Sequence, residues 1–189
     1  MGNTVLYMSM SLDGFIAGPN ETDENGLGDG GGRLHEWVFP PEGGANAQIV
    51  DEFMSTGAVV AGRGTFEPAE GWHGDHHGGV PIWVLSRRPM PAWARDMSAV
   101  HYTNDIAAAF RDARQAAGDK DVLVHGAATA QRAIAAAFLD EIEIHLIPVL
   151  LAEGRRLFEH LGSPRRELER IRVLPGEGGV THLRYRIRY

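Results

Sequence analysis

Apolar and polar positions divide the chain into segments of two kinds. Short apolar runs bounded by Gly, Pro, Asn or Asp predict buried strands at residues 4–11, 58–61, 81–85, 99–103 and 122–124. Apolar residues at helical spacing predict helices at residues 45–55, from 104 to about 117, and 127–138. Only strands are predicted after these, at residues 141–151, 166–174 and 180–189. This order predicts an α/β fold with a mostly parallel central sheet flanked by helices and an antiparallel C-terminal hairpin.

Size and composition narrow the class of protein. The 189 residues include 43% hydrophobic and 23% charged residues, with no repeat or linker, so we expect one domain over residues 1–189. The absence of Cys excludes disulfides, thiolate metal sites and Cys nucleophiles. A net charge of −7 argues against nucleic-acid binding, and no apolar run is long enough to span a membrane. Without a signal segment after Met1, we expect a cytoplasmic protein.

One apolar run ends abruptly at Gly62 and is followed by Arg63, Gly64 and Thr65. This pattern predicts a buried strand that ends at a turn and opens a helix. Backbone N–H groups at such a turn attract phosphate, the glycines allow close approach, and Arg supplies a permanently charged fork. The alternative is an ordinary strand-to-helix turn with a solvated Arg.

Two further strand ends carry residues that could bind phosphate. The first is followed by Ser86, Arg87 and Arg88. The second is followed by Gly126, Ala127, Ala128 and Thr129. The non-functional alternative is an exposed basic turn for the first strand end and close packing of a helix on the sheet for the second. Because the carboxyl ends of parallel strands meet at one edge, the three turns together predict a dinucleotide held along that edge.

The Gly- and acid-rich segment at residues 18–32 is long for a loop and is typical of a lid over a site. Polar residues near it are candidates for proton transfer: Asp13, His35 and Glu36. Aromatic residues beside loops either wall a substrate pocket or cover the core: Trp37, Phe39 and Trp72.

Three histidines, His73, His76 and His77, lie in a glycine-rich loop beside Asp75. A metal-dependent hydrolase would need ligands fixed by a strand or helix, which this loose spacing does not provide. We therefore expect a solvated loop and no metal site.

Several motifs, in this order, resemble the dihydrofolate reductase superfamily. They are similar above all to the branch that contains the reductase domain of bifunctional riboflavin-biosynthesis deaminase-reductases. The motifs lie at residues 9–17, 62–67, 85–87, 126–129, 138–142 and 147–158. Each is weak alone, but their order and spacing cover nearly the whole chain.

The resemblance implies a sheet of about eight strands with helices on both faces, and NADPH as cofactor. Family members often form homodimers through their C-terminal strands. The resemblance also assigns cofactor contacts to the turns: phosphate contacts at Gly62, Arg63 and Thr65, the 2′-phosphate at Ser86 and Arg87, and the pyrophosphate at Gly126, Ala127, Ala128 and Thr129. The nicotinamide would be bordered by backbone groups of Ser9, Ile16 and Ala17.

The sequence departs from the family pattern in two places. Dihydrofolate reductases hold the pterin with an acidic residue on a helix, and the matching position falls near Asn46, with Asp51 a turn further on. Ala127 follows Gly126 where relatives commonly have a second glycine. The zinc motif of the deaminase half is absent.

We therefore expect a stand-alone reductase that transfers hydride from NADPH to a C=N or C=O bond of a small heterocycle. Candidate substrates are a sugar-bearing pyrimidine of riboflavin biosynthesis and a pterin. Two alternatives stay open on the same fold: a ligand-binding module without turnover, and a variant that binds flavin.

Overall fold

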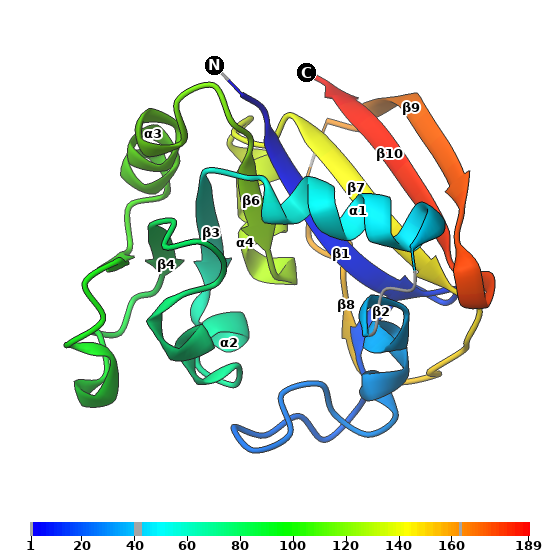
Figure 1. The fold of residues 1–189 in the computed structure, drawn as a ribbon, viewed down its shortest axis with the longest axis horizontal. Coiled ribbons are helices and arrows are strands. Elements are labelled where there is room, and N and C mark those ends of the chain that lie inside the picture. The colour runs from blue at the N-terminus through cyan, green and yellow to red at the C-terminus, as the bar shows by residue number, and fades with distance from the viewer. Residues whose placement is uncertain (1, 40–42, 163) are drawn as a thin grey trace.

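The computed structural model describes residues 2–39, 43–162 and 164–189. Eight strands form the central sheet in the order β5-β4-β3-β6-β1-β7-β10-β9 (Figure 1). Their bounds are β1 Thr4–Ser11, β3 Ala58–Gly62, β4 Ile82–Leu85, β5 Val100–Thr103, β6 Val122–His125, β7 Glu141–Ile147, β9 Glu167–Pro175 and β10 Thr181–Arg188. The six strands from β5 to β7 are parallel, and β10 is antiparallel to both β7 and β9. The predicted fold class is confirmed.

Helices cover both faces of this sheet because its central strands are apolar on both sides. The helices are α1 Gly44–Met54, α2 Arg63–Phe66, α3 Ile106–Ala117 and α4 Ala127–Ala135. α3 and α4 pack in one apolar cluster with Leu6 and Val60, whereas α1 and α2 contribute Phe53 and Phe66 to the cluster of the opposite face. Burial on both faces is what parallel strands require.

Local capping signals set the limits of α3. The Asp105 carboxylate accepts a hydrogen bond of 3.0 Å from the Ala108 N–H, and Gly118 ends the helix at a φ of 62°. α4 ends at Ala135, three residues before the predicted end, because Ala137 has a φ of 57°. This turn places the Phe138 ring against Phe110, with ring centroids 5.6 Å apart.

Two other elements differ from the sequence prediction. The long strand predicted at 141–151 ends at Ile147, before Pro148. A second, two-stranded sheet pairs β2 (Phe15–Ala17) with β8 (Arg155–Arg156) in antiparallel fashion. It ties the segment after β1 to the connection between β7 and β9.

An ionic network attaches the C-terminal hairpin to the body of the sheet. Arg184 of β10 is 14% exposed and lies 2.7 Å from Glu141 and 3.5 Å from Glu52. Arg172 of β9 contacts Glu52 at 2.6 Å and Glu143 at 3.0 Å. Glu143 is fully buried, and burial raises the pKa of its carboxyl while the two arginines oppose the shift.

Across the described ranges, no helix has both the length and the apolar character needed to cross a bilayer.

Candidate functional site

The carboxyl ends of four neighbouring parallel strands lie level with one another. In the sheet register, Gly62 is opposite Leu85, Leu85 is opposite Thr103, and Ala61 is opposite His125. The turns that follow these strands therefore lie side by side at one edge of the sheet. β3 and β6 are neighbours, but the chain continues from β3 to β4 on one side and from β6 to β7 on the other (Figure 1). Such a switch in direction is where open α/β sheets bind ligands.

The two glycine junctions, after β3 and after β6, contact each other directly. Gly126 has a φ of 92°, and a Cβ there would lie 2.5 Å from the Thr65 Oγ1. A Cβ at Gly62 would lie 3.0 Å from the Thr129 Oγ1. We call Gly62, Gly64, Thr65, Gly126 and Thr129 the glycine cradle. The two junctions pack this closely only because Gly62 and Gly126 carry no side chain; within the cradle Gly126 and Thr129 are buried and Gly64 is exposed.

Arg63 is anchored beside the cradle. Its Nη1 donates to Glu67 at 2.6 Å, and Glu67 also accepts a hydrogen bond from the Tyr102 hydroxyl at 3.3 Å. Burial first, and then the Glu67 carboxylate, raises the pKa of Tyr102. Arg63 is therefore fixed in place, with part of its charge offset by Glu67.

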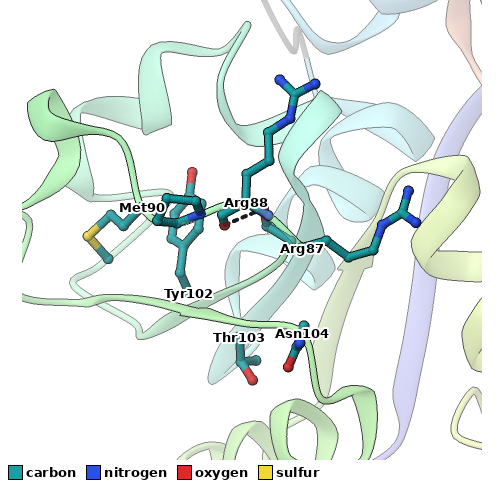
Figure 2. Close-up of a pocket in the computed structure, with 8 residues that line it drawn as sticks. Arg87, Arg88, Met90, Tyr102, Thr103 and Asn104 are labelled. Carbon is teal, nitrogen blue, oxygen red and sulfur yellow. Dashed lines mark hydrogen bonds between the residues drawn. The ribbon is translucent and has the colours of Figure 1, made fainter.

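A basic mouth opens next to the cradle, at the ends of β4 and β5. It is a cavity of about 540 Å³, lined by Ser86, Arg87, Arg88, Pro89, Met90, Tyr102, Thr103 and Asn104 (Figure 2). Arg87 and Arg88 extend from the turn in different directions, and neither has an ion-pair partner among the residues that the structure describes. The Ser86 hydroxyl donates to the Arg88 carbonyl at 2.8 Å and accepts from the Arg88 N–H at 3.0 Å, which shapes the turn.

β1 brings the predicted nicotinamide border next to the cradle. The Gly126 N–H lies 3.4 Å from the Met8 Sδ, which places the start of α4 beside β1. Ser9, one residue further on, is buried, and its Oγ accepts a 2.9 Å hydrogen bond from the Trp37 Nε1. Ile16 and Ala17 are buried in β2. Of the remaining cofactor candidates, Ala127 is buried and Ala128 is exposed.

The three proton-transfer candidates have different surroundings. Asp13 accepts hydrogen bonds from the Ser11 hydroxyl and from the backbone N–H groups of Leu151 and Ala152, at 2.6, 3.2 and 2.8 Å. These bonds, that of Ser11 first, lower the pKa of Asp13, so its carboxylate serves as an acceptor that ties two loops together. Glu36 is exposed and lies 3.3 Å from Arg33.

His35 differs from both carboxylates. It lies on a 3-10 helix at Gly31–Val38, and burial lowers the pKa of its imidazole. Its Nδ1 is buried without a hydrogen-bond partner among the described residues. A buried ring nitrogen left free in this way is unusual in a structural histidine.

A second cavity, of about 320 Å³, lies beyond the end of β7. Its walls include Trp37, Phe39, Asn46, Ile147 and Glu177. Trp72, the third predicted wall residue, lies elsewhere and packs against Phe66 with ring centroids 5.6 Å apart. It therefore belongs to the core.

A buried pair of histidines that sequence analysis missed supports this cavity. His145 and His182 lie opposite each other on β7 and β10, with their Nδ1 atoms 3.0 Å apart, and the His182 Nε2 lies 3.0 Å from the Asn46 Oδ1. The Asn46 amide nitrogen donates to the carbonyls of Trp37 and Glu177, so its oxygen must accept from His182. His182 then accepts from His145. Burial lowers the pKa of His182 to about 4, so the pair is neutral.

A signal for this pair does exist in the sequence. Polar residues occupy every second position of β7, at Glu141, Glu143 and His145, and of β10, at His182, Arg184 and Arg186. Such alternation indicates a polar face that must find partners across the strands.

The cavity is also fastened from the hairpin turn. The Glu177 carboxylate accepts hydrogen bonds from the N–H groups of Ala45 and Asn46, at 3.2 and 3.0 Å. These backbone bonds, that of Asn46 first, lower the pKa of Glu177. α1 thus receives its N-terminal cap from a distant turn, because its own N-cap residue, Gly43, has no side chain to provide one.

The expectation of a solvated histidine loop was wrong for two of its three residues. His77 is buried, and its Nδ1 lies 2.7 Å from the Nδ1 of His76, whose Nε2 lies 3.3 Å from the Nε2 of His125. Burial lowers the pKa of His76 to about 2 and that of His125 to about 4. Only His73 is exposed as expected. Within the described ranges, no group of three His, Asp or Glu side chains is arranged to hold a metal ion.

Comparison with known proteins adds the family. The sequence matches the RibD C-terminal domain over residues 4–180. The chain belongs to this family. The resemblance to the riboflavin-biosynthesis reductase branch is thereby confirmed, and the RibD C-terminal domain is a reductase-type fold. A comparison with curated protein sequences gave no match.

Solved structures agree with this fold. A putative riboflavin biosynthesis protein from Shewanella sp. PV-4 is 22% identical, with a TM-score of 0.73 and 99% of each chain covered. RibD from Acinetobacter baumannii is 15% identical, with a TM-score of 0.65, and this chain, covered in full, spans 59% of its length. Dihydrofolate reductase from Enterococcus faecalis, solved with NADP(H), is 14% identical, with a TM-score of 0.61, 100% of this chain and 98% of that chain covered.

Proposed function

We propose that this RibD-type domain is a stand-alone, NADPH-dependent reductase of a small heterocycle, formed by residues 1–189. The observation that carries the proposal is the contact between the two glycine junctions beside arginines that have no carboxylate partner among the described residues. A dinucleotide has an anionic centre and, in NADPH, one additional phosphate at the adenosine end. The edge of the sheet offers glycine turns, with Gly64 exposed, and guanidinium groups without a carboxylate partner among the described residues.

Each part of the edge suits one part of the cofactor. A Cβ at Gly62 or Gly126 would meet Thr129 or Thr65, so these glycines let the two turns and the start of α4 converge where the pyrophosphate would bind. Arg87, with Ser86 at its side, would bind the 2′-phosphate. Ser9, Ile16 and Ala17 would border the nicotinamide, which supplies the hydride when the cofactor is bound.

The cavity beyond β7 would hold the substrate. Trp37 supplies an aromatic wall for a planar ring, and Phe39 lies at the rim. Asn46 stands where a pterin-binding acid would be, and its amide is already committed to His182 and two carbonyls. This arrangement favours a pyrimidine of riboflavin biosynthesis over a pterin, with reduction at a C=N or C=O bond.

Glu36 is the best-placed of the three candidates to handle the proton that must follow the hydride. It is exposed and lines the cavity beyond β7, with Arg33 3.3 Å away. The His35 Nδ1 has no hydrogen-bond partner among the described residues, but it is buried and His35 does not line the cavity, whereas Asp13 is saturated by three donors.

The homodimer expected from the family would form through β9. This edge strand exposes three apolar side chains: Leu168, Ile171 and Val173. Light scattering after gel filtration would show a mass of twice 20.6 kDa. The cytoplasmic location stays a prediction.

The test of the function is a titration of the protein with NADPH and with NADH. NADPH should bind much more tightly, and Arg87→Ala should weaken NADPH binding about tenfold while leaving NADH unchanged, because one charge-assisted phosphate contact is worth about 1.5 kcal/mol. Arg111→Ala, which removes an exposed arginine of α3, is the matched control. Equal affinities for the two cofactors in the wild-type protein would contradict the proposal.

A panel of pyrimidines, pterins and quinones then tests turnover by NADPH oxidation. Tight cofactor binding without turnover of any compound would indicate the binding module. A yellow purified protein would indicate the flavin variant.

A further inference from the structure

The side chain of Arg155, in β8, lies against the glycine cradle although the two are distant in sequence. A Cβ at Gly64 would lie 3.3 Å from the Arg155 Nη1. No cofactor contact was predicted for this arginine, because 91 residues separate it from Gly64 and nothing in the sequence links the two.

The position of this guanidinium is fixed at two points. The backbone of Arg155 pairs with Ala17 in the small β2–β8 sheet, and its Nη2 lies 2.8 Å from a carboxylate oxygen of Glu21. Glu21 belongs to the Gly- and acid-rich segment after β2. Only Nη2 is used in this ion pair, so the N–H groups of Nη1 remain for the side that faces Gly64.

The next residue along β8, Arg156, provides a contrast. Its guanidinium lies 4.3 Å from the centroid of the Phe15 ring, and its Nη1 donates to the Asp13 carbonyl at 3.0 Å. Successive side chains of a strand point to opposite sides, so the two arginines serve different surfaces.

We propose that Arg155 is a further cofactor-binding residue, which donates from Nη1 to the diphosphate of the dinucleotide held in the glycine cradle. Glu21 acts as its positioning residue. Arg63 is paired with Glu67 as Arg155 is with Glu21, and Arg155 brings a second cation to the diphosphate from β8. This proposal rests on the proposed NADPH site and extends it to a residue of the β7–β9 connection.

The diphosphate is common to NADPH, NADH and ADP-ribose, whereas the 2′-phosphate occurs only in NADPH. Arg155→Met should therefore weaken all three ligands to a similar extent, about tenfold. The ratio of the NADPH and NADH dissociation constants should stay unchanged, unlike the narrowed ratio expected for Arg87→Ala. Arg155→Lys should recover part of the loss, since it keeps the charge and loses the fork.

The measurements are fluorescence titrations with each ligand, together with thermal unfolding to show that every variant is folded. Arg156→Met is the matched control, with the same change of charge one residue away, and should bind all three ligands as the wild type does. If Arg155→Met does not fold, Arg155→Lys decides, with an equal loss of about threefold or more for the three ligands supporting the proposal.

Affinities of Arg155→Met within twofold of the wild type would overturn the proposal and leave the NADPH site intact. A loss confined to NADPH would overturn it as well, because Arg155 would then serve the 2′-phosphate. A wild-type protein that binds none of the three ligands would overturn both this proposal and the proposed function.

Discussion

The arginines at the two sides of the sheet have opposite surroundings. At the ends of β4 and β5, Arg87 and Arg88 have no carboxylate partner among the residues that the structure describes. On the hairpin side, Arg172 and Arg184 contact Glu52 and Glu143 at distances from 2.6 to 3.8 Å. Arginine side chains thus stabilise the fold in one region, whereas in the other region they remain available to a ligand.

The contrast bears on how an acidic protein would bind the anionic cofactor that we propose. The chain has a net charge of −7, but its carboxylates are not spread evenly. Glu52, Asp121, Glu141 and Glu143 surround the buried Arg184, since an unpaired charge in the interior is costly. The number of carboxylates around an arginine and its burial, and not the net charge of the chain, therefore indicate whether it serves the fold.

The largest effect expected from this contrast is on stability at the hairpin side. Arg184→Met would leave Glu141, Glu143 and Glu52 close together with one cation fewer. We expect a loss of about 3–5 kcal/mol in the free energy of unfolding, measured in urea, because a buried network that loses one partner keeps its uncompensated charges. The NADPH to NADH affinity ratio of the folded fraction should not change.

Arg88→Met provides the comparison on the other side. It removes the same charge from an exposed side chain without a carboxylate partner among the described residues, so the free energy of unfolding should change by less than about 0.5 kcal/mol. Equal losses in the two variants would refute the distinction between fastening and ligand-binding arginines.

The second expected effect comes from backbone strain in the glycine cradle, without any change of charge. Gly126→Ala places a Cβ at a φ of 92° and 2.5 Å from the Thr65 Oγ1. We expect a loss of about 1–3 kcal/mol in unfolding free energy, together with loss of dinucleotide binding in titrations. Gly32→Ala is the control, because a Cβ at Gly32 would meet no described atom within 4 Å and the backbone there has no positive φ. Normal NADPH binding by Gly126→Ala would show that the cradle does not hold the cofactor.

The smallest expected effect is on the free energy of unfolding at acidic pH, and it comes from His76. Burial lowers the pKa of His76 to about 2, below its value in the unfolded chain, so the unfolded state binds more protons as the pH falls. Stability is fully present above pH ~6.5 and is lost below it, by about 1.4 kcal/mol per pH unit for this histidine. Urea unfolding at pH 7 and pH 5 should show a weaker acid sensitivity in His76→Gln.

His73→Gln should behave as the wild type does, because His73 is exposed. A wild-type protein that is as stable at pH 5 as at pH 7 would mean that His76 takes up a proton in the folded protein as readily as in the unfolded chain.

Sequence patterns predicted those parts of the fold that depend on neighbours in the chain. The limits of α3 follow from Asp105 and Gly118, and the apolar runs of β1, β3 and β6 read directly as buried strands. The pairing of β2 with β8 was not predictable, because it joins Phe15 to Arg156 through a few backbone bonds without an apolar pattern. Likewise, the left-handed turn at Ala137 was not predictable, because alanine is not a residue that favours a positive φ.

The candidate site divides in the same way. Glycine turns at strand ends identified the cradle, because parallel strands bring such turns to one edge whatever the rest of the chain does. Asn46, His145 and His182 meet through a helix and two strands that are distant in sequence, and Arg155 of β8 meets Gly64 of α2. Contacts of this kind depend on the three-dimensional arrangement of elements, which spacing along one chain does not encode.

The carboxylate of Glu177 makes the first turn of α1 depend on a residue made more than 130 positions later. During synthesis on the ribosome, the N–H groups of this turn therefore stay without their carboxylate partner until the hairpin has emerged, and the wall of the second cavity that contains Asn46 is completed late. Amide hydrogen exchange at Ala45 and Asn46 would follow the closing of the hairpin, although both residues lie in the first half of the chain.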